Sequence, residues 1–411
     1  MGQPIGCPVK LMPKVNQGIL RWARETAGLT PEQAAEKLQV RPARGLSPLN
    51  RLTALERGEE DPTRRMLAGM ARVYRRPLVV FYMSRRPRRG DRGQDFRTLP
   101  EGRNAADEAL LDALIRDVRA RQGMVRAVIE DEDEAEVCAF VGSAKIADGV
   151  QALVASIQDR LGLSRETLYT QASPFDAFSL LRRHVESIGV FVLLKGDLGS
   201  YHSAMDVETF RGLALADSVA PFVVINDQDS KTAWSFTLIH ELAHLWLGQT
   251  GVSGERTELG IERFCNDVAG QFLLPAEELD QLPLASAPDA EALRDLIADF
   301  AGRRNLSGPM VAYRLYRDGR VKYETWSHLS DTFREKWFQE RDTQRQKSRQ
   351  QEGGPNFYVV RAHRVGSALL NLVERMLGTG ALTTSKAGKV LGVKPKQVEA
   401  LLRQKVGRRL A

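Results

Sequence analysis

The first 83 residues of the chain alternate short apolar stretches with glycine and proline positions that begin and end helices. Apolar residues recur at helical spacing over 15–27, and this stretch stops at a glycine. Thr30-Pro31 and Ser47-Pro48 each place a capping side chain before a proline, which predicts the starts of a second and a third helix. A fourth helix and a short apolar fifth segment follow. The pattern predicts an all-helical bundle over residues 1–83.

Further along the chain, the spacing of apolar residues changes from helical to strand-like and back. Three apolar runs bounded by turn residues, 189–194, 210–216 and 221–226, predict the strands of a small sheet. An apolar helix over 235–248 follows directly, and helical spacing predominates through the rest of 105–325. Sheet and helices are therefore expected to build one α+β domain around this apolar helix.

The C-terminal part returns to helices alone. An amphipathic helix is predicted over 357–377, then Ser385 is expected to cap a helix and Pro395 to open another after a glycine turn. This two-helix turn is either a second DNA-contacting element or a packing unit. We predict an α+β chain in four segments: a helical bundle (1–83), a basic linker rich in Arg, Gly and Pro (84–104), a central domain (105–325) and a C-terminal helical domain (326–411).

Charge is distributed very unevenly along the chain. Residues 1–100 hold 20 Lys and Arg against 9 Asp and Glu, and residues 341–411 hold 15 against 4, so each end carries +11. The whole chain carries only +7, which leaves −15 for the middle. Two basic ends around an acidic centre indicate that the ends meet phosphates. The alternative is that the basic ends dock on the acidic middle.

Cysteine content and hydropathy indicate a cytoplasmic protein. Cys7, Cys138 and Cys265 are odd in number, far apart and without a CxxC pair, which disfavours both a disulfide framework and a thiolate metal site. No apolar run approaches the ~20 residues of a membrane helix, and the first residues do not have the pattern of a secretory signal. We therefore expect no membrane association.

The apolar helix at 235–248, expected to be capped by Ser235, carries the chemistry. His240 and His244 are four residues apart, so both imidazoles lie on one helical face and can bind one zinc ion. Glu241 lies on an adjoining face, where it reaches a metal-activated water without being a ligand. The ion would lower the pKa of that water to about 7 and Glu241 would accept its proton, so that the hydroxide attacks a peptide carbonyl.

A third ligand is required to complete a catalytic zinc site. Glu262 is the best candidate, because it begins an otherwise apolar helix and a carboxylate with two imidazoles is a known catalytic set. Glu255, Glu258 and Asp267 are rival ligands on spacing alone. Cys265 is interpreted as a small buried apolar residue. His202, Arg211 and Tyr313 are further candidates for donating a hydrogen bond to the transition state.

The N-terminal bundle resembles DNA-binding domains of the XRE/Cro-repressor type. The likeness rests on residues 20–30 and on the run Ala54-Leu55-Glu56-Arg57-Gly58-Glu59 through Pro62-Thr63. It implies that the third helix enters the major groove with Asn50, Arg51 and Thr53. The link over 39–46 is longer than the tight turn that such domains use. The alternative is a helical bundle that holds a protein partner.

The central domain resembles the ImmA/IrrE family of metallopeptidases. The likeness rests on residues 208–212 and 221–226, on His240-Glu241-Leu242-Ala243-His244, on Glu262 with Asn266 and Leu273-Leu274-Pro275, and on 306–315. It implies a zincin-like fold in which His240, His244 and Glu262 bind zinc. It also implies a DNA-bound repressor or an antitoxin-like regulator as the protein substrate.

Two functional hypotheses follow. The first is a zinc-dependent regulatory endopeptidase that also binds DNA through its N-terminal domain. The second is a DNA-binding transcriptional regulator or antitoxin of a toxin–antitoxin pair, in which zinc is structural or proteolysis is absent.

Overall fold

The computed structural model describes residues 14–43, 45–87, 105–199, 203–253, 260–350 and 356–407. The chain divides into two compact units, Met1–Asp91 with Gly102–Leu114, and Arg92–Glu101 with Ile115–Ala411. Most of the predicted basic linker, 88–104, lies outside the described residues. Within those described ranges, no helix is long and apolar enough to cross a membrane.

The first unit is helical, and its helices begin at the predicted caps. Thr30 forms a capping box with Gln33, in which Gln33 N donates to Thr30 Oγ1 at 3.2 Å and Thr30 N donates to Gln33 Oε1 at 3.1 Å. Ser47 caps the third helix by accepting a hydrogen bond from the backbone N–H of Asn50, and Gly58 ends it with a φ of 78°. The elements are α1 (Gln17–Glu25), α2 (Pro31–Lys37), α3 (Pro48–Arg57), α4 (Arg64–Val73) and the 3₁₀ turn η1 (Leu78–Tyr82).

An apolar core and one buried ion pair hold these helices together. Leu20, Leu52 and Phe81 are fully buried in that core. Arg24 on α1 donates two hydrogen bonds to Glu56 on α3, Nε to Oε1 at 2.7 Å and Nη2 to Oε2 at 3.0 Å. Both side chains are almost completely buried, so this bidentate pair fixes how α1 crosses α3.

The second unit is mostly helical around a small mixed sheet. β1 (Phe191–Leu194) pairs in parallel with β3 (Phe222–Ile225), β3 pairs antiparallel with β2 (Gly212–Leu215), and β2 pairs antiparallel with β4 (Gly251–Ser253). The strand order is therefore β1-β3-β2-β4. Every residue of β1, β2 and β3 is buried, which explains why these strands are continuous apolar runs. The three predicted strands are confirmed, and β4 was not predicted.

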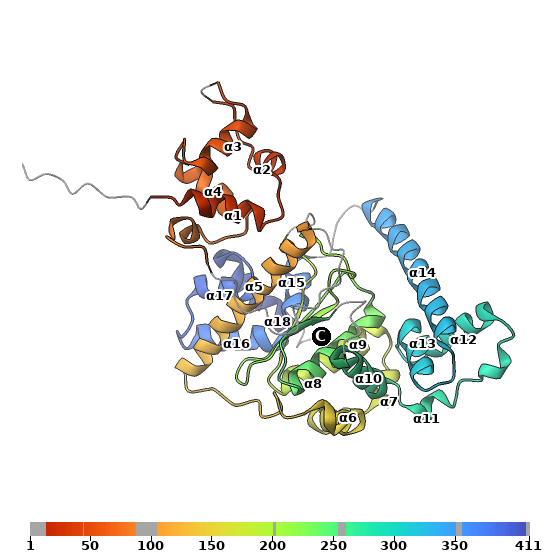
Figure 1. The fold of residues 1–411 in the computed structure, drawn as a ribbon. Coiled ribbons are helices and arrows are strands. Elements are labelled where there is room, and N and C mark those ends of the chain that lie inside the picture. The colour runs from red at the N-terminus through yellow and green to blue at the C-terminus, as the bar shows by residue number, and fades with distance from the viewer. Residues whose placement is uncertain are drawn as a thin grey trace, which may run out of the picture. The chain divides into compact units, whose positions relative to one another are not determined.

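Helices surround this sheet (Figure 1). α9 (Lys231–Trp246) packs on β2 and β3, and α8 (Pro174–Ser187) and α10 (Gly260–Leu273) pack on α9. The first turns of α5 (Ala105–Asp131) belong to the first unit and the rest to the second. The remaining elements before the C-terminal helices are η3 (Ile146–Asp148), α6 (Val150–Leu161), α7 (Arg165–Tyr169), α11 (Ala276–Leu279), η5 (Leu284–Ser286), α12 (Ala290–Gly302), α13 (Gly308–Arg317) and α14 (Tyr323–Gln350).

The C-terminal helices belong to the same compact unit as the sheet. In Figure 1 they lie on the side of the sheet opposite α12, α13 and α14, and α15 and α16 contact β1. The elements are α15 (Phe357–Val365), α16 (Ser367–Gly378), α17 (Thr384–Leu391), η6 (Pro395–Gln397) and α18 (Val398–Gly407). The prediction of one helix over 357–377 was wrong, because Gly366 has a φ of 89° and separates α15 from α16. Ser385 was also wrong as a cap, since Thr383 caps α17.

A buried ion pair holds the junction of α15 and α16 to the sheet. Arg182 and Glu186 on α8 pair at 3.0 Å, and both side chains are nearly inaccessible. Glu186 Oε2 accepts hydrogen bonds from the backbone N–H groups of Ser367 at 3.0 Å and Ala368 at 3.1 Å, at the N-terminus of α16. Arg182 donates to the carbonyl oxygens of His363 and Val192. The buried charges are thus satisfied at the helix ends.

Part of the basic C-terminal segment docks on the acidic middle. Arg364 on α15 pairs with Asp197 at 3.0 Å and with Asp227 at 2.6 Å. Arg375 on α16 pairs with Glu134 at 2.6 Å. For these arginines, charge complementarity within the protein accounts for the uneven charge distribution.

Candidate metal centre

α9 is an almost completely buried helix, and it presents the chemistry-bearing residues to the interior. Its N-cap is Ser230, whereas the predicted cap Ser235 lies inside the helix and is buried. The expectation for Ser235 was wrong because helical spacing extends one turn further toward the N-terminus, to Lys231. Gly248 follows the helix with a φ of 68°, as predicted for its end.

Three side chains of α9 and α10 converge on one point. The Nε2 atoms of His240 and His244 are 3.1 Å apart. Glu262, in the first turn of α10, places Oε2 at 3.3 Å from His240 Nε2 and Oε1 at 3.3 Å from His244 Nε2. All three residues are buried, and their ligand atoms lie within 4.8 Å of one another. The structure therefore brings together the three residues that the sequence analysis selected as metal ligands.

The donor set and its spacing fit a tetrahedral zinc ion. Ligand atoms at ~2.0–2.1 Å from a tetrahedral zinc lie about 3.3 Å from one another. The 3.1 Å between the two imidazole nitrogens, and the 3.3 Å from each nitrogen to a different carboxylate oxygen of Glu262, are close to this spacing. Two imidazoles and one carboxylate leave one tetrahedral position for water or a substrate oxygen. This is the arrangement of a catalytic site rather than a closed structural site.

The two histidines favour the ionised form of Glu262. Burial opposes its ionisation, but hydrogen bonds and charge attraction from His240 and His244 outweigh burial and hold its pKa well below the usual value. Cys265, one turn later on α10, is completely buried beside His244. Burial raises the pKa of its thiol, which agrees with the interpretation of Cys265 as a small apolar residue.

Glu241 is fully buried and lies directly against strand β2. A Cβ atom added to Gly212 would be 2.7 Å from Glu241 Cδ and 2.8 Å from Glu241 Cγ, which is far inside van der Waals contact. Only glycine therefore leaves room for this carboxylate beside the strand. Sequence reasoning missed Gly212, although a glycine inside a predicted strand is a known signal of close approach.

We expect Gly212→Ala to lower peptide hydrolysis by about 100-fold, because a displacement of about 1 Å in a catalytic group has an effect of this size. Metal binding should be unchanged, since the three ligands do not contact Gly212. The measurement is kcat/KM together with metal content. Gly302→Ala is the control, because an added Cβ there meets no atom within 4 Å. Full activity of Gly212→Ala would show that the position of Glu241 against β2 is unimportant.

The rival candidates for the third ligand are placed differently in the structure. Glu255 and Glu258 lie outside the described residues. Asp267 is engaged elsewhere, because Oδ1 accepts a hydrogen bond from Tyr313 Oη at 2.8 Å and Oδ2 pairs with Arg317 Nη2 at 2.6 Å. Burial, reinforced by Asp267, raises the pKa of Tyr313, so its hydroxyl stays protonated.

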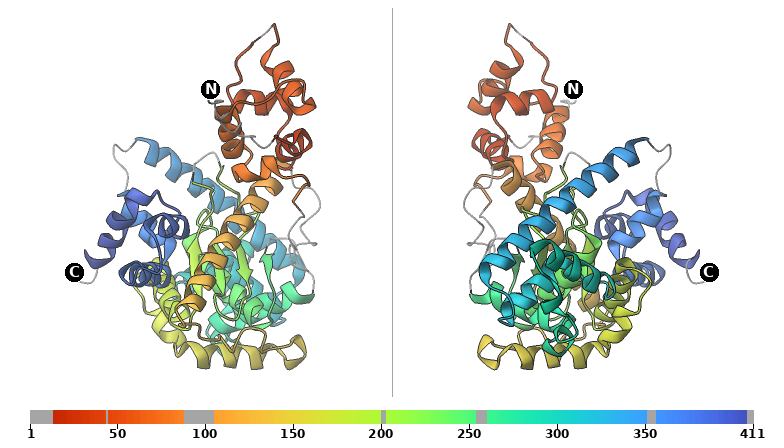
Figure 2. Two further views of the ribbon diagram at one scale, coloured as in Figure 1. Left: turned by 90° about the vertical axis from the view of Figure 1, so that its left-hand side faces the viewer. Right: turned by 90° about the vertical axis from the view of Figure 1, so that its right-hand side faces the viewer.

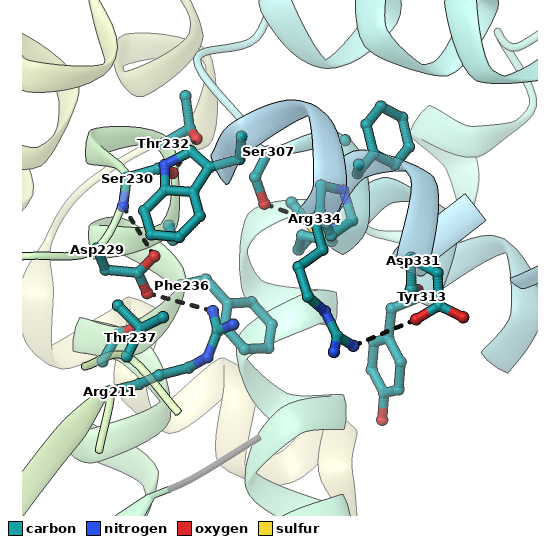
Figure 3. Close-up of a pocket in the computed structure, with 18 of the residues that line it drawn as sticks. Arg211, Asp229, Ser230, Thr232, Phe236, Thr237, Ser307, Tyr313, Asp331 and Arg334 are labelled. Atoms are coloured by element: carbon teal, nitrogen blue, oxygen red, sulfur yellow. Dashed lines mark hydrogen bonds and ion pairs between the residues drawn. The ribbon is translucent and has the colours of Figure 1, made fainter. Parts of the chain in front are cut away.

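A cleft of about 1300 Å³ opens onto the centre at His240 and Glu262. Arg211 and Tyr313 both line it, as Figure 3 shows, so two of the three predicted transition-state donors share a cleft with His240 and Glu262. Arg211 Nη1 pairs with Asp229 Oδ2 at 3.2 Å. His202, the third predicted donor, lies outside the described residues.

Asn226 positions the segment that precedes β2. It is completely buried, and its Nδ2 donates to the carbonyl oxygens of Met205 at 3.2 Å and Phe210 at 3.0 Å. Its backbone N–H donates to the carbonyl oxygen of Arg211 at 2.9 Å. The turn after the third strand was predicted, but no pattern in the sequence shows that this amide fixes Arg211.

The predicted DNA-contacting residues lie on α3 of the first unit. Asn50 is exposed, and its backbone N–H donates to Ser47 Oγ at 3.2 Å. Arg51 is held internally, with Nη2 at 2.9 Å from Glu60 Oε1 and Nη1 donating to the carbonyl oxygen of Arg41 at 3.0 Å. Thr53 Oγ1 donates to the carbonyl oxygen of Leu49 at 3.0 Å.

Comparison with known proteins agrees with this geometry over part of the chain. Residues 190–316 match the family model described as the IrrE N-terminal-like domain, Peptidase_M78. The radiation response metalloprotease IrrE of Deinococcus deserti is 34% identical over 102 residues, which cover 23% of this chain and 35% of that protein. No solved structure gave a significant match. Residues 190–316 therefore form an IrrE-like metalloprotease domain, with a candidate metal site at His240, His244 and Glu262.

Proposed function

We propose that the protein is a zinc-dependent endopeptidase that cleaves a protein regulator such as a repressor or an antitoxin. The observation that carries this proposal is the convergence of His240, His244 and Glu262 at a point where His240 and Glu262 line a large cleft. Glu241 on the same helix supplies a carboxylate beside this centre. The likeness of 190–316 to a metalloprotease supports the proteolytic reaction over other hydrolyses.

Each residue has a separate role in the proposed reaction. Bound zinc would lower the pKa of a water and polarise the peptide carbonyl. Glu241 accepts the proton of the attacking water at its carboxylate and passes it to the leaving amine nitrogen. Arg211 is the better of the two described donors for the carbonyl oxygen, because a guanidinium has five N–H donors and pairs with Asp229 through Nη1, whereas the single O–H of Tyr313 already donates to Asp267.

The proposal is tested by incubating the zinc-loaded full chain with a peptide library prepared from a whole soluble proteome. Mass spectrometry of new N-termini should show internal cleavage, with a preference at the cleaved bond, that a zinc chelator abolishes and added zinc restores. Any regulator that a neighbouring gene encodes is then offered as an intact protein. Cleavage that persists in the presence of the chelator, or no cleavage of any peptide, contradicts a zinc endopeptidase.

We further propose that the first unit binds DNA, as an XRE-type domain would. Support comes from the +11 charge of residues 1–100 and from the exposed position of Asn50 at the start of α3. The same observations favour the second hypothesis, a DNA-binding regulator or antitoxin without proteolysis. We also propose a cytoplasmic location, which the free thiols of Cys138 and Cys265 support.

We expect the full chain to shift DNA from upstream of its own gene in a gel assay, with affinity that falls steeply as salt rises. Asn50→Ala should weaken binding by about 1–3 kcal/mol, the size of one good base contact, and should reduce sequence preference. Arg51 is less suitable for this test because its replacement also removes the pair with Glu60. Gln39→Ala, in the link before α3, is the control. The absence of a shift at low salt would remove DNA binding.

A further inference from the structure

The cleft that opens onto the metal centre is unusually rich in aromatic side chains. Eight of its 35 lining residues are aromatic, about one in four, whereas aromatic residues make up 7% of the chain. Most of its lining comes from α9 between Thr232 and His240 with the loop before it, from α10, and from α13 and α14. The aromatic residues are Phe236, Tyr313, Tyr316, Tyr323, Trp326, Phe333, Trp337 and Phe338. Five of the eight therefore belong to α14.

The aromatic residues of α14 form one stripe along the helix. Trp326, Phe333 and Trp337 are spaced by seven and four residues, so they share one helical face. Trp326 stacks on Tyr316 at a centroid distance of 4.9 Å, and the Phe333 ring lies where a Cβ of Gly308 would be. These two residues anchor the first half of α14 to α13.

Trp337 continues this stripe beyond the anchored half of the helix. It is half-buried, and its ring contacts Phe338 at 4.9 Å and the guanidinium of Arg341 at 4.9 Å, both on its own helix. Figure 2 shows that the later turns of α14 extend beyond α12 and α13. Trp337 therefore presents an apolar ring to the cleft from a helix that projects beside it.

The charges in the cleft favour an acidic occupant. Seven Lys and Arg line it against five Asp and Glu, and one of the five is the metal ligand Glu262. On α14, Arg334 and Arg341 are seven residues apart and lie next to the aromatic stripe. Figure 3 shows Arg334 and Arg211 in the cleft lining, where Arg334 pairs with Asp331 at 3.4 Å and Arg211 pairs with Asp229 at 3.2 Å. Because the cations outnumber the carboxylates, a negatively charged side chain would meet a net positive charge in the cleft.

We infer that α14 is the recognition wall for the substrate. It selects a polypeptide segment with a large apolar side chain that packs on Trp337 and an acidic side chain that faces Arg334 and Arg341. This inference rests on the proposed function, because a chain lying along α14 also lies against His240 and Glu262 in the same cleft. Aromatic and arginine residues are the side chains that most often dominate binding at such surfaces.

The test measures peptide binding by the zinc-loaded Glu241→Gln chain, in which bound peptide stays intact. Three fluorescein-labelled peptides of equal length carry the central sequences Glu-Leu-Phe-Glu, Lys-Leu-Phe-Lys and Glu-Ser-Ser-Glu. We expect the first to bind tightest by fluorescence anisotropy. Trp337→Ala should weaken its binding at least about tenfold. Arg341→Gln should remove the preference for acidic over basic flanks.

Two control variants separate recognition from general damage. Phe357→Ala removes an aromatic residue of α15 that is 54% exposed, and Gln339→Ala changes an exposed residue of α14 outside the cleft lining. Both should bind the first peptide as the parent does. Unchanged binding by Trp337→Ala, or equal binding of the acidic and basic peptides, would overturn the inference.

The outcomes distinguish this inference from the proposed function. If binding depends on Trp337 but the wild type hydrolyses none of the peptides, recognition by α14 stands and the endopeptidase proposal fails. If the wild type hydrolyses peptides and Trp337→Ala leaves KM unchanged, the endopeptidase stands and recognition by α14 is wrong.

Discussion

Glu241→Gln is expected to lower peptide hydrolysis by about 10²- to 10⁴-fold, the contribution of a general base, while the protein keeps its metal. Glutamine has nearly the shape of glutamate, so it fits beside Gly212 as the native side chain does. It cannot accept the proton of the attacking water. The loss should therefore appear in kcat with little change in KM. Steady-state kinetics on a peptide from the library, with the metal content of the same sample, give this result.

The control for this substitution is Glu277→Gln, which changes an exposed carboxylate on α11. It should hydrolyse peptides at the wild-type rate. Retention of most activity by Glu241→Gln would assign the base to another residue. Loss of metal together with activity would instead place Glu241 among the ligands, contrary to its separation from the converging group of His240, His244 and Glu262.

Loss of a residue that only hydrogen-bonds to a metal ligand weakens metal binding roughly 10- to 100-fold. Glu262→Gln changes a ligand itself, so it is expected to weaken zinc binding by more than this. The reason is that Glu262 contributes the only negative charge among the three converging ligands. At limiting zinc, the rate of peptide hydrolysis should fall together with the zinc affinity. At high zinc, this rate should recover partly. Zinc affinity is measured by competition with a coloured chelator, so this readout does not depend on activity.

Asp267→Asn is the matched control, because Asp267 lies on the same helix but pairs with Tyr313 and Arg317. Its zinc affinity should equal that of the wild type. Glu255→Gln and Glu258→Gln should also bind zinc normally. If one of these variants loses the metal while Glu262→Gln retains it, Glu262 is not the third ligand.

The metal ligands were predictable because their geometry is local. Two histidines four residues apart on one helix must share a face, whatever the rest of the chain does. Glu262 comes from a second helix, and spacing alone left Glu255, Glu258 and Asp267 as rivals. The structure places Glu262 with the histidines and engages Asp267 elsewhere. The strands were also predictable, because full burial makes β1, β2 and β3 continuous apolar runs.

Features that depend on contacts between distant segments were not predictable. Gly212 leaves room for Glu241, which follows 29 residues later, and Asn226 reaches back to Met205 and Phe210. The short strand β4 has too few residues to show a period. The attachment of α16 through Arg182 and Glu186 joins residues about 180 positions apart. The cleft wall on α14 was not predicted from sequence, because its aromatic residues are scattered among charges.

Our main expectation is that His240, His244 and Glu262 bind one zinc ion beside the cleft. To test this directly, the purified full chain is incubated with zinc and the excess zinc is removed by gel filtration. Plasma emission spectroscopy then measures how much zinc the protein retains. We predict one equivalent of zinc per chain for the wild type and none for the His240→Ala, His244→Ala double variant. A wild type that retains no zinc, or a double variant that retains a full equivalent, would contradict the account.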